Sequence, residues 1–323
     1  MPEQFLSCDW GTSNFRLRLV DAGSASVVRE LSTPDGVDRI SPGSNDRFRA
    51  LLDERCGELI DAADLDLSDT PLWISGMASS SIGWRDVPYA PVPFALDGSS
   101  ARVADLGPLS KRRPCPVRLV SGLRTETDVL RGEETEALGI LVACADDAME
   151  RERVLVLPGT HSKHLLVRGG AIVDFRTTMT GEVYEILRQH SILRHSVDDV
   201  VELDDDRECA FRDGSRRGAR GPLLSLLFSV RTRQLLHGDS PCRCGAYLSG
   251  LLLGSEMRAA GDLAGEDAEV LLGVRGLMSR LYLAAAQEVG LGTQARLVDE
   301  KVLASAAPQG HAVLTSAAPS LLA

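Results

Sequence analysis

The sequence predicts an α/β protein built from two similar halves. Its 323 residues favour two domains over one. Apolar residues recur with a period of two in some segments and at steps of three and four in others, which indicates strands and helices in one chain. The third observation is an internal repeat. A strand, a Gly-Thr pair, two polar residues and a second strand occur around Gly11 and again around Gly159, 148 positions later.

The first half is expected to hold several strands and two helices. Phe15, Leu17 and Leu19 alternate with Arg16 and Arg18, which is the period of a strand with one buried face. Between residues 45 and 64 the apolar residues instead recur at helical steps. The predicted strands are residues 4–8, 15–19, a strand that begins at 27, 72–74 and 117–120, and the predicted helices are residues 45–64 and about 125–145.

The second half begins after a polar stretch at residues 145–153. We therefore expect an N-terminal domain over residues 1–147 and a C-terminal domain over residues 148–323. The predicted strands are residues 154–157, 164–167 and, as the last strand, 269–273; the predicted helices are residues 182–193, 223–236, 247–260 and 276–290. The remaining tail is rich in Ala and Ser and predicts no element.

Composition and charge exclude several classes of protein. The net charge is −11 and the longest basic run is Lys111-Arg112-Arg113, which argues against nucleic-acid binding because clustered cations hold phosphate backbones. No stretch of about 18 apolar residues predicts a membrane helix, and the N-terminus lacks a signal-peptide pattern. Seven cysteines, an odd number, favour a reducing compartment, so we expect a cytoplasmic protein. Cys242 and Cys244 lie close together but lack the further ligands of a metal site.

The two Gly-Thr pairs predict phosphate-binding turns. Glycine lets a phosphate approach the backbone, and N–H groups and short hydroxyls can donate to its oxygens. Two such turns at matching places could hold one polyphosphate, although each residue is also a common turn former. Asp9 directly precedes the first turn, where a carboxylate could hold a hydrated Mg²⁺ ion. The candidate residues are Gly11, Thr12, Ser13 and Asn14 in the first turn and Gly159, Thr160, His161 and Ser162 in the second, with Lys163 as a neighbouring cation.

Two other nucleotide-binding patterns are missing from the sequence. No glycine is followed by lysine, so there is no Walker motif. No strand leads into a G-x-G-x-x-G turn either. The paired hairpin turns are therefore the phosphate-binding feature that the sequence supports.

Several segments carry a resemblance to a known family. Residues 8–16 are similar to the first phosphate motif of the sugar kinase/actin/Hsp70 superfamily, although Cys8 stands where many relatives carry an aliphatic residue. Four further segments resemble the 2-dehydro-3-deoxygalactonokinase family, in the family's order. They are residues 75–84, 131–135, 157–163 and 179–182. The resemblance extends over about residues 5–290, and its blocks are more specific than a single Asp-x-Gly-Thr.

The resemblance implies two RNase H-like (actin-like ATPase) domains with a nucleotide cleft between them. It also implies Mg²⁺-dependent phosphoryl transfer from ATP to the 6-hydroxyl of 2-dehydro-3-deoxy-D-galactonate, which gives 2-dehydro-3-deoxy-6-phospho-D-galactonate in galactonate catabolism. The first domain would carry the sugar-acid site and the second the adenosine site. The superfamily's adenosine motif is rich in Gly-Gly, whereas its equivalent here is residues 272–276, with Gly273 as the expected contact.

In kinases of this superfamily the catalytic base lies roughly two dozen residues before the second turn, so the resemblance implies a base there. Glu133 and Glu134 lie 26 and 25 positions before Gly159, and Asp128 lies 31 positions before it. We favour the pair Glu133 and Glu134 without separating its members, and keep Asp128 as the alternative. Any of the three could instead be a solvated helix charge.

A sugar-acid substrate needs a cation for its carboxylate and polar groups for its hydroxyls. Arg124 is the favoured cation because it is nearest to the predicted base, and Arg16 and Arg176 are alternatives. Trp84 is expected to cover the sugar. The residues expected to line it belong to the turn after residues 72–74 and include Gly76, Met77, Ala78 and Ser79.

Alternatives to this function stay open at the level of sequence. Within the class, the chain could phosphorylate another small sugar acid, because pocket contacts cannot be read from sequence. Outside it, the chain could be an actin-like ATPase module or a phosphatase-like hydrolase. Only a kinase would need a sugar acid for turnover. The sequence leaves the oligomeric state open, with a homodimer as one outcome.

Overall fold

The computed structural model describes residues 3–40, 44–60, 70–145, 151–265, 267–317 and 319–322. Contacts divide the chain into two compact units. Unit 1 comprises Met1–Met149, Gly170–Val173 and Lys301–Ala323, and unit 2 comprises Glu150–Gly169 and Asp174–Glu300. The expected boundary between residues 147 and 148 lies outside the described residues. The C-terminal segment belongs to unit 1, whereas the sequence had placed it in the second domain.

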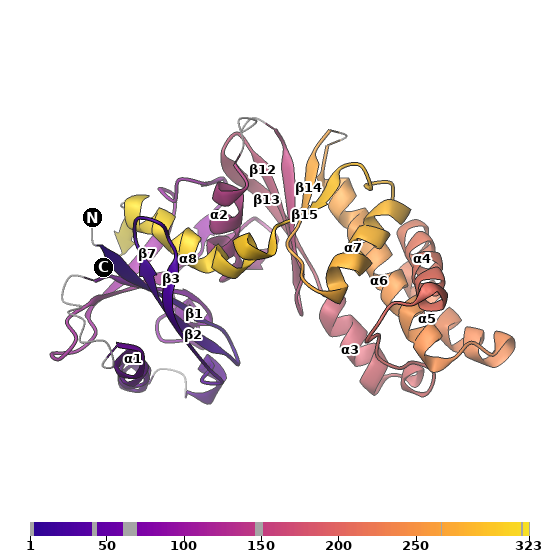
Figure 1. Ribbon diagram of the computed structural model, residues 1–323, viewed down its shortest axis with the longest axis horizontal. Helices are drawn as coiled ribbons and strands as arrows, with labels where there is room; N and C mark the ends of the chain where they lie inside the picture. Colours follow the sequence, from indigo (N-terminus) through magenta and orange to yellow (C-terminus); the bar gives the residue numbers. More distant parts are fainter. Residues whose placement is uncertain are drawn as a thin grey trace. The chain divides into compact units, whose positions relative to one another are not determined.

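Unit 1 is organised around a seven-stranded sheet with the order β16-β7-β8-β4-β1-β2-β3 (Figure 1). Its strands are β1 Gln4–Trp10, β2 Phe15–Asp21, β3 Val27–Thr33, β4 Leu72–Gly76, β7 Arg102–Pro108, β8 Pro116–Val120 and β16 Ser320–Leu322. β1 pairs antiparallel with β2 and parallel with β4, and β4 pairs parallel with β8. Because β1 and β4 are parallel, their last residues, Trp10 and Gly76, lie side by side at one edge.

The second large sheet has the order β15-β14-β11-β12-β13-β6, and most of its residues belong to unit 2. Its strands are β11 Arg153–Leu157, β12 Ser162–Arg168, β13 Ala171–Thr178, β14 Glu269–Leu272 and β15 Ala295–Leu297. β11 pairs antiparallel with β12 and parallel with β14, which pairs parallel with β15. The first residues of β13 belong to unit 1, where they pair with β6, Phe94–Ala95.

The two sheets share one topology. When β7 and β16 of the first sheet and β6 of the second are left out, the order β3-β2-β1-β4-β8 in unit 1 corresponds to the order β13-β12-β11-β14-β15 in unit 2. Corresponding pairs also agree in direction: β1 with β2 and β11 with β12 are antiparallel, β1 with β4 and β11 with β14 are parallel, and β4 with β8 and β14 with β15 are parallel. This order is that of an RNase H-like fold, so the structure confirms the predicted fold class and the internal repeat.

The helices of unit 1 pack on its sheet and on one another. They are α1 Asn45–Ile60, α2 Glu133–Ala143 and α8 Glu300–Ala317. Phe48 of α1 packs against Trp10 with ring centroids 5.3 Å apart, inside the main apolar core of this unit. α2 and α8 meet through glycines, since a Cβ at Gly310 would overlap the carbonyl oxygen of Thr135 and one at Gly139 would overlap that of Ala306.

We expect Gly310→Ala to destabilise the protein, because the added methyl has no room against the α2 backbone. Overpacking of this kind costs about 1–3 kcal/mol, which should appear as a lower thermal midpoint. Gly261→Ala is the matched control, because Gly261 also lies in a helix but its Cβ would meet only Leu291 at an ordinary 3.4 Å. An unchanged midpoint in Gly310→Ala would contradict the close contact of α2 and α8.

The helices of unit 2 are α3 Thr180–His190, α4 Asp205–Arg220, α5 Leu223–Thr232, α6 Pro241–Leu263 and α7 Leu277–Glu288. A π-helical segment, Arg233–His237, continues α5. α4 was not predicted from sequence. It packs on α6 through glycines rather than through an apolar stripe, because Cβ atoms at Gly218 and Gly254 would overlap the carbonyl oxygens of Leu251 and Ser215.

The structure corrects the helix expected over residues 125–145. β9, Leu123–Arg124, directly precedes this stretch, and β10, Val129–Leu130, lies within it; both form a three-stranded sheet with β5, Ala90–Pro91. The turn between them is closed by Thr125, whose hydroxyl accepts the Asp128 amide at 2.9 Å. α2 begins only at Glu133, after Gly132 with φ +107°. Similarly, β14 is not the last strand, since β15 and β16 follow it.

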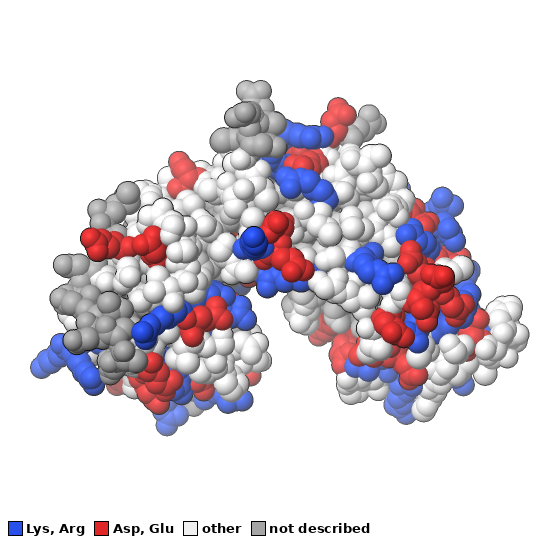
Figure 2. Space-filling model, viewed as in Figure 1, with Lys and Arg blue, Asp and Glu red and all other residues white. Residues whose placement is uncertain are grey.

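The surface and the helices add two observations. On the face shown in Figure 2, basic and acidic side chains lie interspersed over each unit. Among the described residues, no helix combines the length and apolar character needed to cross a bilayer.

Candidate active site

The first predicted phosphate turn, residues 11–14, links β1 and β2 and is held by backbone contacts. The amide of Gly11 donates to the Asn14 carbonyl at 2.9 Å, and the Asp38 amide donates to the Thr12 carbonyl at 3.1 Å. Gly36 passes so close that a Cβ there would overlap Thr12. Thr12, Ser13 and Asn14 are exposed. The turn is therefore fixed at its base, with its short polar side chains open to solvent.

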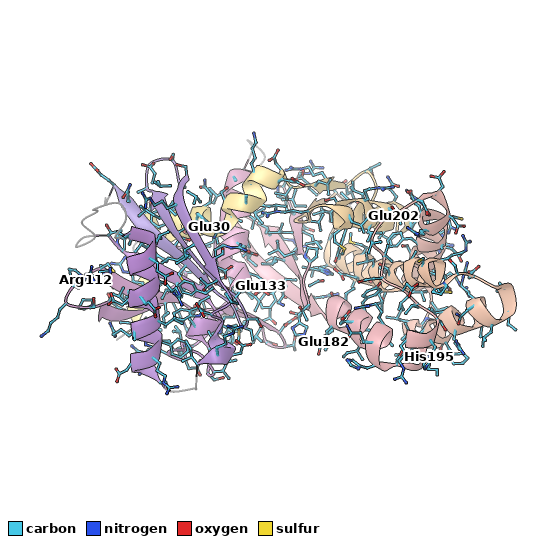
Figure 3. The ribbon with its side chains drawn as sticks, turned by 60° about the horizontal axis from the view of Figure 1, so that its bottom comes forward. Glu30, Arg112, Glu133, Glu182, His195 and Glu202 are labelled. Atoms are coloured by element: carbon cyan, nitrogen blue, oxygen red, sulfur yellow. The ribbon has the colours of Figure 1, made fainter. Side chains whose placement is uncertain are left out.

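The second turn, residues 159–162, links β11 and β12 in the same way. The Glu182 amide donates to the Thr160 carbonyl at 3.0 Å, which matches the Asp38 contact in unit 1. The carboxylate of Glu182 (Figure 3) also lies 2.6 Å from Nε2 of His161. In both units, the chain after the third strand thus supports the turn. Gly159, Thr160 and His161 are exposed, whereas Ser162 and Lys163 are buried, and Lys163 Nζ donates to the His161 carbonyl at 2.8 Å.

Three backbone segments converge beside the first turn. A Cβ at Gly76, at the end of β4, would lie 2.7 Å from the Trp10 carbonyl oxygen and 3.5 Å from a carboxylate oxygen of Asp9. A Cβ at Gly132, just before α2, would lie 3.2 Å from the Cα of Gly76. Both glycines have positive φ, +94° and +107°, which L side chains rarely adopt. The two glycines bring the start of α2 next to Asp9.

This convergence gathers four carboxyl groups and shifts three of their pKa values. Burial, and then the charge of Glu133, raises the pKa of Glu134 to about 8. Burial, with the charges of Asp9 and Glu133, raises the pKa of Glu136 to about 7. Burial also raises the pKa of Asp9, which Arg16 and Arg18 lower and Glu133 raises. Glu133 therefore interacts with each of the other three carboxyl groups.

The geometry separates the two glutamates that the sequence left as a pair. Glu134 is 1% exposed, and its carboxyl group accepts the Gly132 amide at 2.6 Å and the Thr135 hydroxyl at 3.0 Å. Glu133 (Figure 3) is only partly buried and accepts the Arg131 amide at 3.0 Å. At neutral pH a carboxyl group with a pKa of about 8 is mostly protonated and cannot take another proton. Glu133 is the better placed proton acceptor.

We expect Glu134→Gln to stabilise the protein increasingly as pH rises from about 4.5 to 8. The fold raises the pKa of Glu134 from its ordinary 4.5 to about 8, so the folded protein loses stability as pH passes through this window. Glutamine removes this loss. Thermal midpoints of variant and wild type should converge near pH 4 and separate by pH 8, while the exposed Glu126→Gln shows no such trend. Parallel curves at all pH values would contradict the buried, protonated carboxyl group.

The expected sugar-lining turn after β4 is largely engaged in packing. Ala78 and Ser79 are fully buried, and the Ser79 hydroxyl accepts from Arg131 Nη1 at 2.8 Å. Arg131 also stacks on Tyr89, 4.2 Å from the ring centroid, so it fixes this turn to the start of α2. Gly76 is buried and Met77 is partly exposed. Arg131 was not singled out from the sequence, although it lies in one of the blocks that carry the resemblance.

Trp84 occupies a different place from the one expected. It is 4% exposed, stacks on Phe48 at 6.1 Å with an interplanar angle of 10°, and meets the edge of Trp10 at 6.4 Å. Because the indole is enclosed by the core of unit 1, the structure does not support its expected role as a cover over the sugar.

The expected cations and Asp128 lie at separate places. Arg16 is exposed and lines a cavity of about 340 Å³ with Asp9, Gly11 and Asn14. Arg124 is exposed on β9, and Asp128 lies in the turn after it rather than on a helix. Arg176 is an exposed residue of β13 in unit 2. Of these residues, the structure brings only Arg16 together with Asp9 in one cavity.

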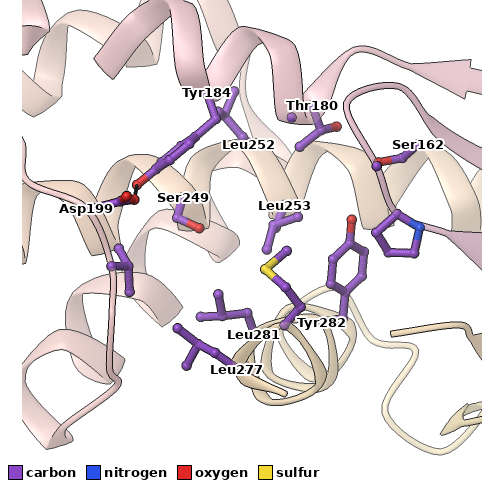
Figure 4. A pocket seen from close by; sticks show the side chains of 15 residues that line it. Ser162, Thr180, Tyr184, Asp199, Ser249, Leu252, Leu253, Leu277, Leu281 and Tyr282 are labelled. Carbon is purple, nitrogen blue, oxygen red and sulfur yellow. Dashed lines mark hydrogen bonds between the residues drawn. The ribbon is translucent and has the colours of Figure 1, made fainter. Parts of the chain in front are cut away.

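Unit 2 holds a second cavity, of about 360 Å³, beside the second turn (Figure 4). Tyr184 and Asp199 lie at one end, where the phenol donates to the carboxylate at 3.4 Å, and Tyr282 and Ser162 lie at the other. Gly273 is not part of the lining, although its amide donates to the Val156 carbonyl at 2.8 Å. The lining is mostly apolar and consists of Pro158, Gly159, Ser162, Thr180, Gly181, Tyr184, Asp199, Val200, Ser249, Leu252, Leu253, Leu277, Met278, Leu281 and Tyr282.

The leucines that line this cavity were recognised in the sequence only as parts of apolar helix faces. Leu277 and Leu281, for example, lie four positions apart, a helical spacing that is equally typical of a core. A cavity that is mostly apolar, with a few polar groups at its ends, has the size and character of a small-molecule site.

Comparison with known proteins places this arrangement in a family. A sequence model of the 2-keto-3-deoxy-galactonokinase family matches residues 9–307. The chain belongs to this family. It is 33% identical over 320 residues to a Rhizobium meliloti (strain 1021) protein named as a probable 2-dehydro-3-deoxygalactonokinase, covering 96% of this chain and 97% of that protein. It is 28% identical to the 2-dehydro-3-deoxygalactonokinase of Escherichia coli (strain K12), covering 97% and 99%.

A solved structure of the 2-keto-3-deoxy-galactonokinase family has the same fold. The crystal structure of a Sinorhizobium meliloti protein assigned as a 2-dehydro-3-deoxygalactonokinase matches with a TM-score of 0.76 and 31% sequence identity. The match covers 97% of this chain and 98% of that one. These comparisons confirm the family that the sequence resembled.

Proposed function

We propose that this protein phosphorylates the 6-hydroxyl of 2-dehydro-3-deoxy-D-galactonate with ATP. The observation that carries the proposal is the convergence of Asp9, the first turn and Glu133 in unit 1 of a chain from the 2-keto-3-deoxy-galactonokinase family. Glu133, whose carboxylate can take a proton, then lies close to Asp9 and the first turn, which can hold a phosphoryl group.

In the proposed reaction, Glu133 is the general base. The 6-hydroxyl oxygen attacks the γ-phosphorus, and its proton passes to the Glu133 carboxylate. A bond forms between O6 and phosphorus, and the bond to the β–γ bridging oxygen breaks, which leaves ADP. The backbones of Gly76 and Gly132 hold the start of α2 beside Asp9 and thereby position the Glu133 base.

The residues of unit 1 fit a magnesium ion of the kind that accompanies ATP. Mg²⁺ is usually held by one or two carboxylates, phosphate oxygens and several waters rather than by a protein cage. Among the described residues, no three or more His, Cys, Asp or Glu side chains are arranged so that they could hold a metal ion by themselves. Asp9 offers a single carboxylate in the same cavity as the first turn, which suits that arrangement. The ion would neutralise charge on the phosphates when bound.

We propose that ATP is bound through both turns and the cavity of unit 2. The exposed polar residues of the first turn and the backbone of the second turn would contact the phosphates. The nucleoside would occupy the cavity, with its base toward Tyr184 and Asp199 and its phosphates toward Gly159. Apolar side chains such as Leu252 and Leu281 would pack on the faces of the base.

Arg16 and Arg124 are the alternative partners for the substrate carboxylate. Arg16 shares a cavity with Asp9, which favours it, whereas Arg124 is exposed on β9. Alanine at the arginine that holds the carboxylate should raise KM for the sugar acid by about tenfold or more and change kcat little, because that contact is made in both ground and transition states. Steady-state kinetics of both variants decides between them. Unchanged KM values in both would reject this pair of candidates.

The proposed activity is tested by ADP release over a panel of sugar acids. The kinase proposal predicts turnover that depends on the sugar acid and is highest with 2-dehydro-3-deoxy-D-galactonate. Highest turnover with a different acid would transfer the proposal to that substrate. ADP release that is equal with and without any sugar acid would instead favour an ATPase or a phosphatase-like hydrolase.

Seven cysteines and the absence of disulfides suit the proposed cytoplasmic location. No disulfide joins them, and all seven lie in the described part of the chain. Such thiols persist in a reducing compartment.

A further inference from the structure

A buried carboxylate, that of Glu256, lies on α6 behind the cavity of unit 2. Its side chain has no exposed surface. One of its oxygens, Oε1, accepts the Tyr282 hydroxyl at 2.8 Å and lies 3.2 Å from Nε2 of His164. His164 is also fully buried, and Tyr282 is 1% exposed. Three titratable side chains from α6, α7 and β12 therefore meet at one oxygen atom.

This group of side chains extends to the wall of the cavity. Thr180, at the start of α3, lies near Glu256 and lowers the pKa of its carboxyl group, and Ser162, in the second turn, lies near Tyr282 and lowers the pKa of its phenol. Among the described residues, the Ser162 hydroxyl and Oε2 of Glu256 form no hydrogen bond. Ser162, Thr180 and Tyr282 all line the cavity, whereas Glu256 does not (Figure 4). The carboxylate thus holds Tyr282 of the cavity wall directly and lies near Thr180, at the start of the helix that supports the second turn.

An ionised carboxylate in this position needs an explanation. Removing a charge from water is costly unless the charge is paired and hydrogen-bonded, and an apolar side chain could fill the same volume without that cost. Hydrogen bonds from its neighbours and the proximity of His164 outweigh the effect of burial and lower the pKa of Glu256 below its ordinary value. The group therefore stays charged in the folded protein, and its hydrogen bonds fix the direction of each partner.

We propose that Glu256 is a positioning residue for nucleotide binding, which holds Tyr282, Thr180 and the second turn in the geometry that the nucleotide contacts. The inference rests on the proposed function, since it takes the cavity of unit 2 as the site of the nucleoside. Glu256 acts through Tyr282, whose ring forms the cavity wall next to the turn. Loss of the carboxylate should weaken binding of the nucleotide and leave the sugar acid unaffected.

The test measures Mg-ADP binding to the purified full-length protein by calorimetry, with Glu256→Gln and Tyr282→Phe as the variants. We expect each variant to bind Mg-ADP about tenfold more weakly, the size of effect expected for a hydrogen bond to a charged group. KM for the sugar acid at saturating ATP should stay within about twofold. Tyr282→Phe keeps the ring and removes only the hydroxyl, so it tests the proposal even if Glu256→Gln does not fold.

A control separates positioning from stability. Glu269→Gln breaks another buried ion pair of unit 2, in which Arg153 lies 3.0 Å from the carboxylate and Arg296 also donates to it. This variant should lower the thermal midpoint but leave Mg-ADP affinity unchanged, because Glu269 is not one of the residues that line the cavity. If Glu269→Gln weakened Mg-ADP as much as Glu256→Gln did, the role of Glu256 would be general stability and the proposal would fail.

A further variant tests the site itself. Ser249→Trp places an indole in the cavity from its partly exposed wall, so it should abolish Mg-ADP binding if the nucleoside lies there. Full affinity in Ser249→Trp would reject the cavity as the nucleoside site, and with it the proposed nucleotide placement. Weak binding in Ser249→Trp together with wild-type affinity in Glu256→Gln and Tyr282→Phe would overturn the role of Glu256 alone.

Discussion

Glu133→Gln is expected to lower kcat by at least about a hundredfold, because a general base contributes typically about 10²–10⁴-fold. Glutamine keeps the size of the side chain and can still accept the Arg131 amide at 3.0 Å, but it cannot take the proton of the attacking hydroxyl. Binding of Mg-ADP should be unchanged, since the proposed role begins at the chemical step. Steady-state kinetics with calorimetry separates the two effects.

Two neighbouring variants serve as controls for Glu133→Gln. Glu134→Gln should retain far more activity, because Glu134 is buried and mostly protonated at neutral pH. Asp128→Asn should also lose little, because Asp128 lies in the turn between β9 and β10. A large kcat loss in Asp128→Asn with both glutamate variants active would move the base to Asp128.

Asp9→Asn is expected to leave the fold intact and to remove most turnover. The amide keeps the shape of the side chain but loses the charge that would hold Mg²⁺ beside the first turn. Stability should be maintained or improved, because burial and Glu133 raise the pKa of Asp9 and the neutral amide avoids that cost. The measurement is kcat at saturating ATP over a titration of Mg²⁺, alongside the thermal midpoint.

The matched control for Asp9→Asn is Asp46→Asn, an exposed carboxylate at the start of α1 in the same unit. It should behave as wild type in both measurements. Near-wild-type kcat in Asp9→Asn at ordinary Mg²⁺ would reject Asp9 as the magnesium ligand.

The topology could be predicted from the sequence because it is encoded locally and twice. The alternation of Phe15, Leu17 and Leu19 with arginines marks a strand, and the Gly-Thr pairs at Gly11 and Gly159 mark hairpin turns in both halves. Such a repeat of strands and turns can be recognised without knowing which distant residues are in contact. The structure accordingly confirms two sheets that share the order of five corresponding strands.

Elements fixed by distant contacts could not be predicted. α4 is rich in charge, and Phe211 is the one large apolar side chain among its buried residues, which otherwise are small: Ala210, Gly214, Ser215 and Gly218. α8 lies in a tail of Ala and Ser and belongs to unit 1 through contacts such as Ser7 with His311, which are 304 positions apart. Such packing has no counterpart in a local sequence window.

The candidate site could be predicted from the sequence only in part, because it too depends on contacts between distant residues. Asp9 and Glu133 belong to recognisable segments, whereas their proximity depends on the positive φ of Gly76 and Gly132. Trp84 is a different case, because an aromatic residue within a motif can belong to a hydrophobic core as well as to a sugar-binding site. The structure places it in the core. Glu136 was missed because nothing in its sequence position distinguishes it from a solvated helix charge.

The central claim is phosphoryl transfer to the 6-hydroxyl, and the most direct test is to identify the product. The protein is incubated with Mg-ATP and 2-dehydro-3-deoxy-D-galactonate, and the phosphorus and carbon NMR spectra of the mixture are recorded. We expect ADP and one sugar phosphate in equal amounts, with the phosphorus coupled to carbon 6 and its protons. Inorganic phosphate in place of a sugar phosphate, or phosphorus coupled to another carbon, would contradict the proposed activity.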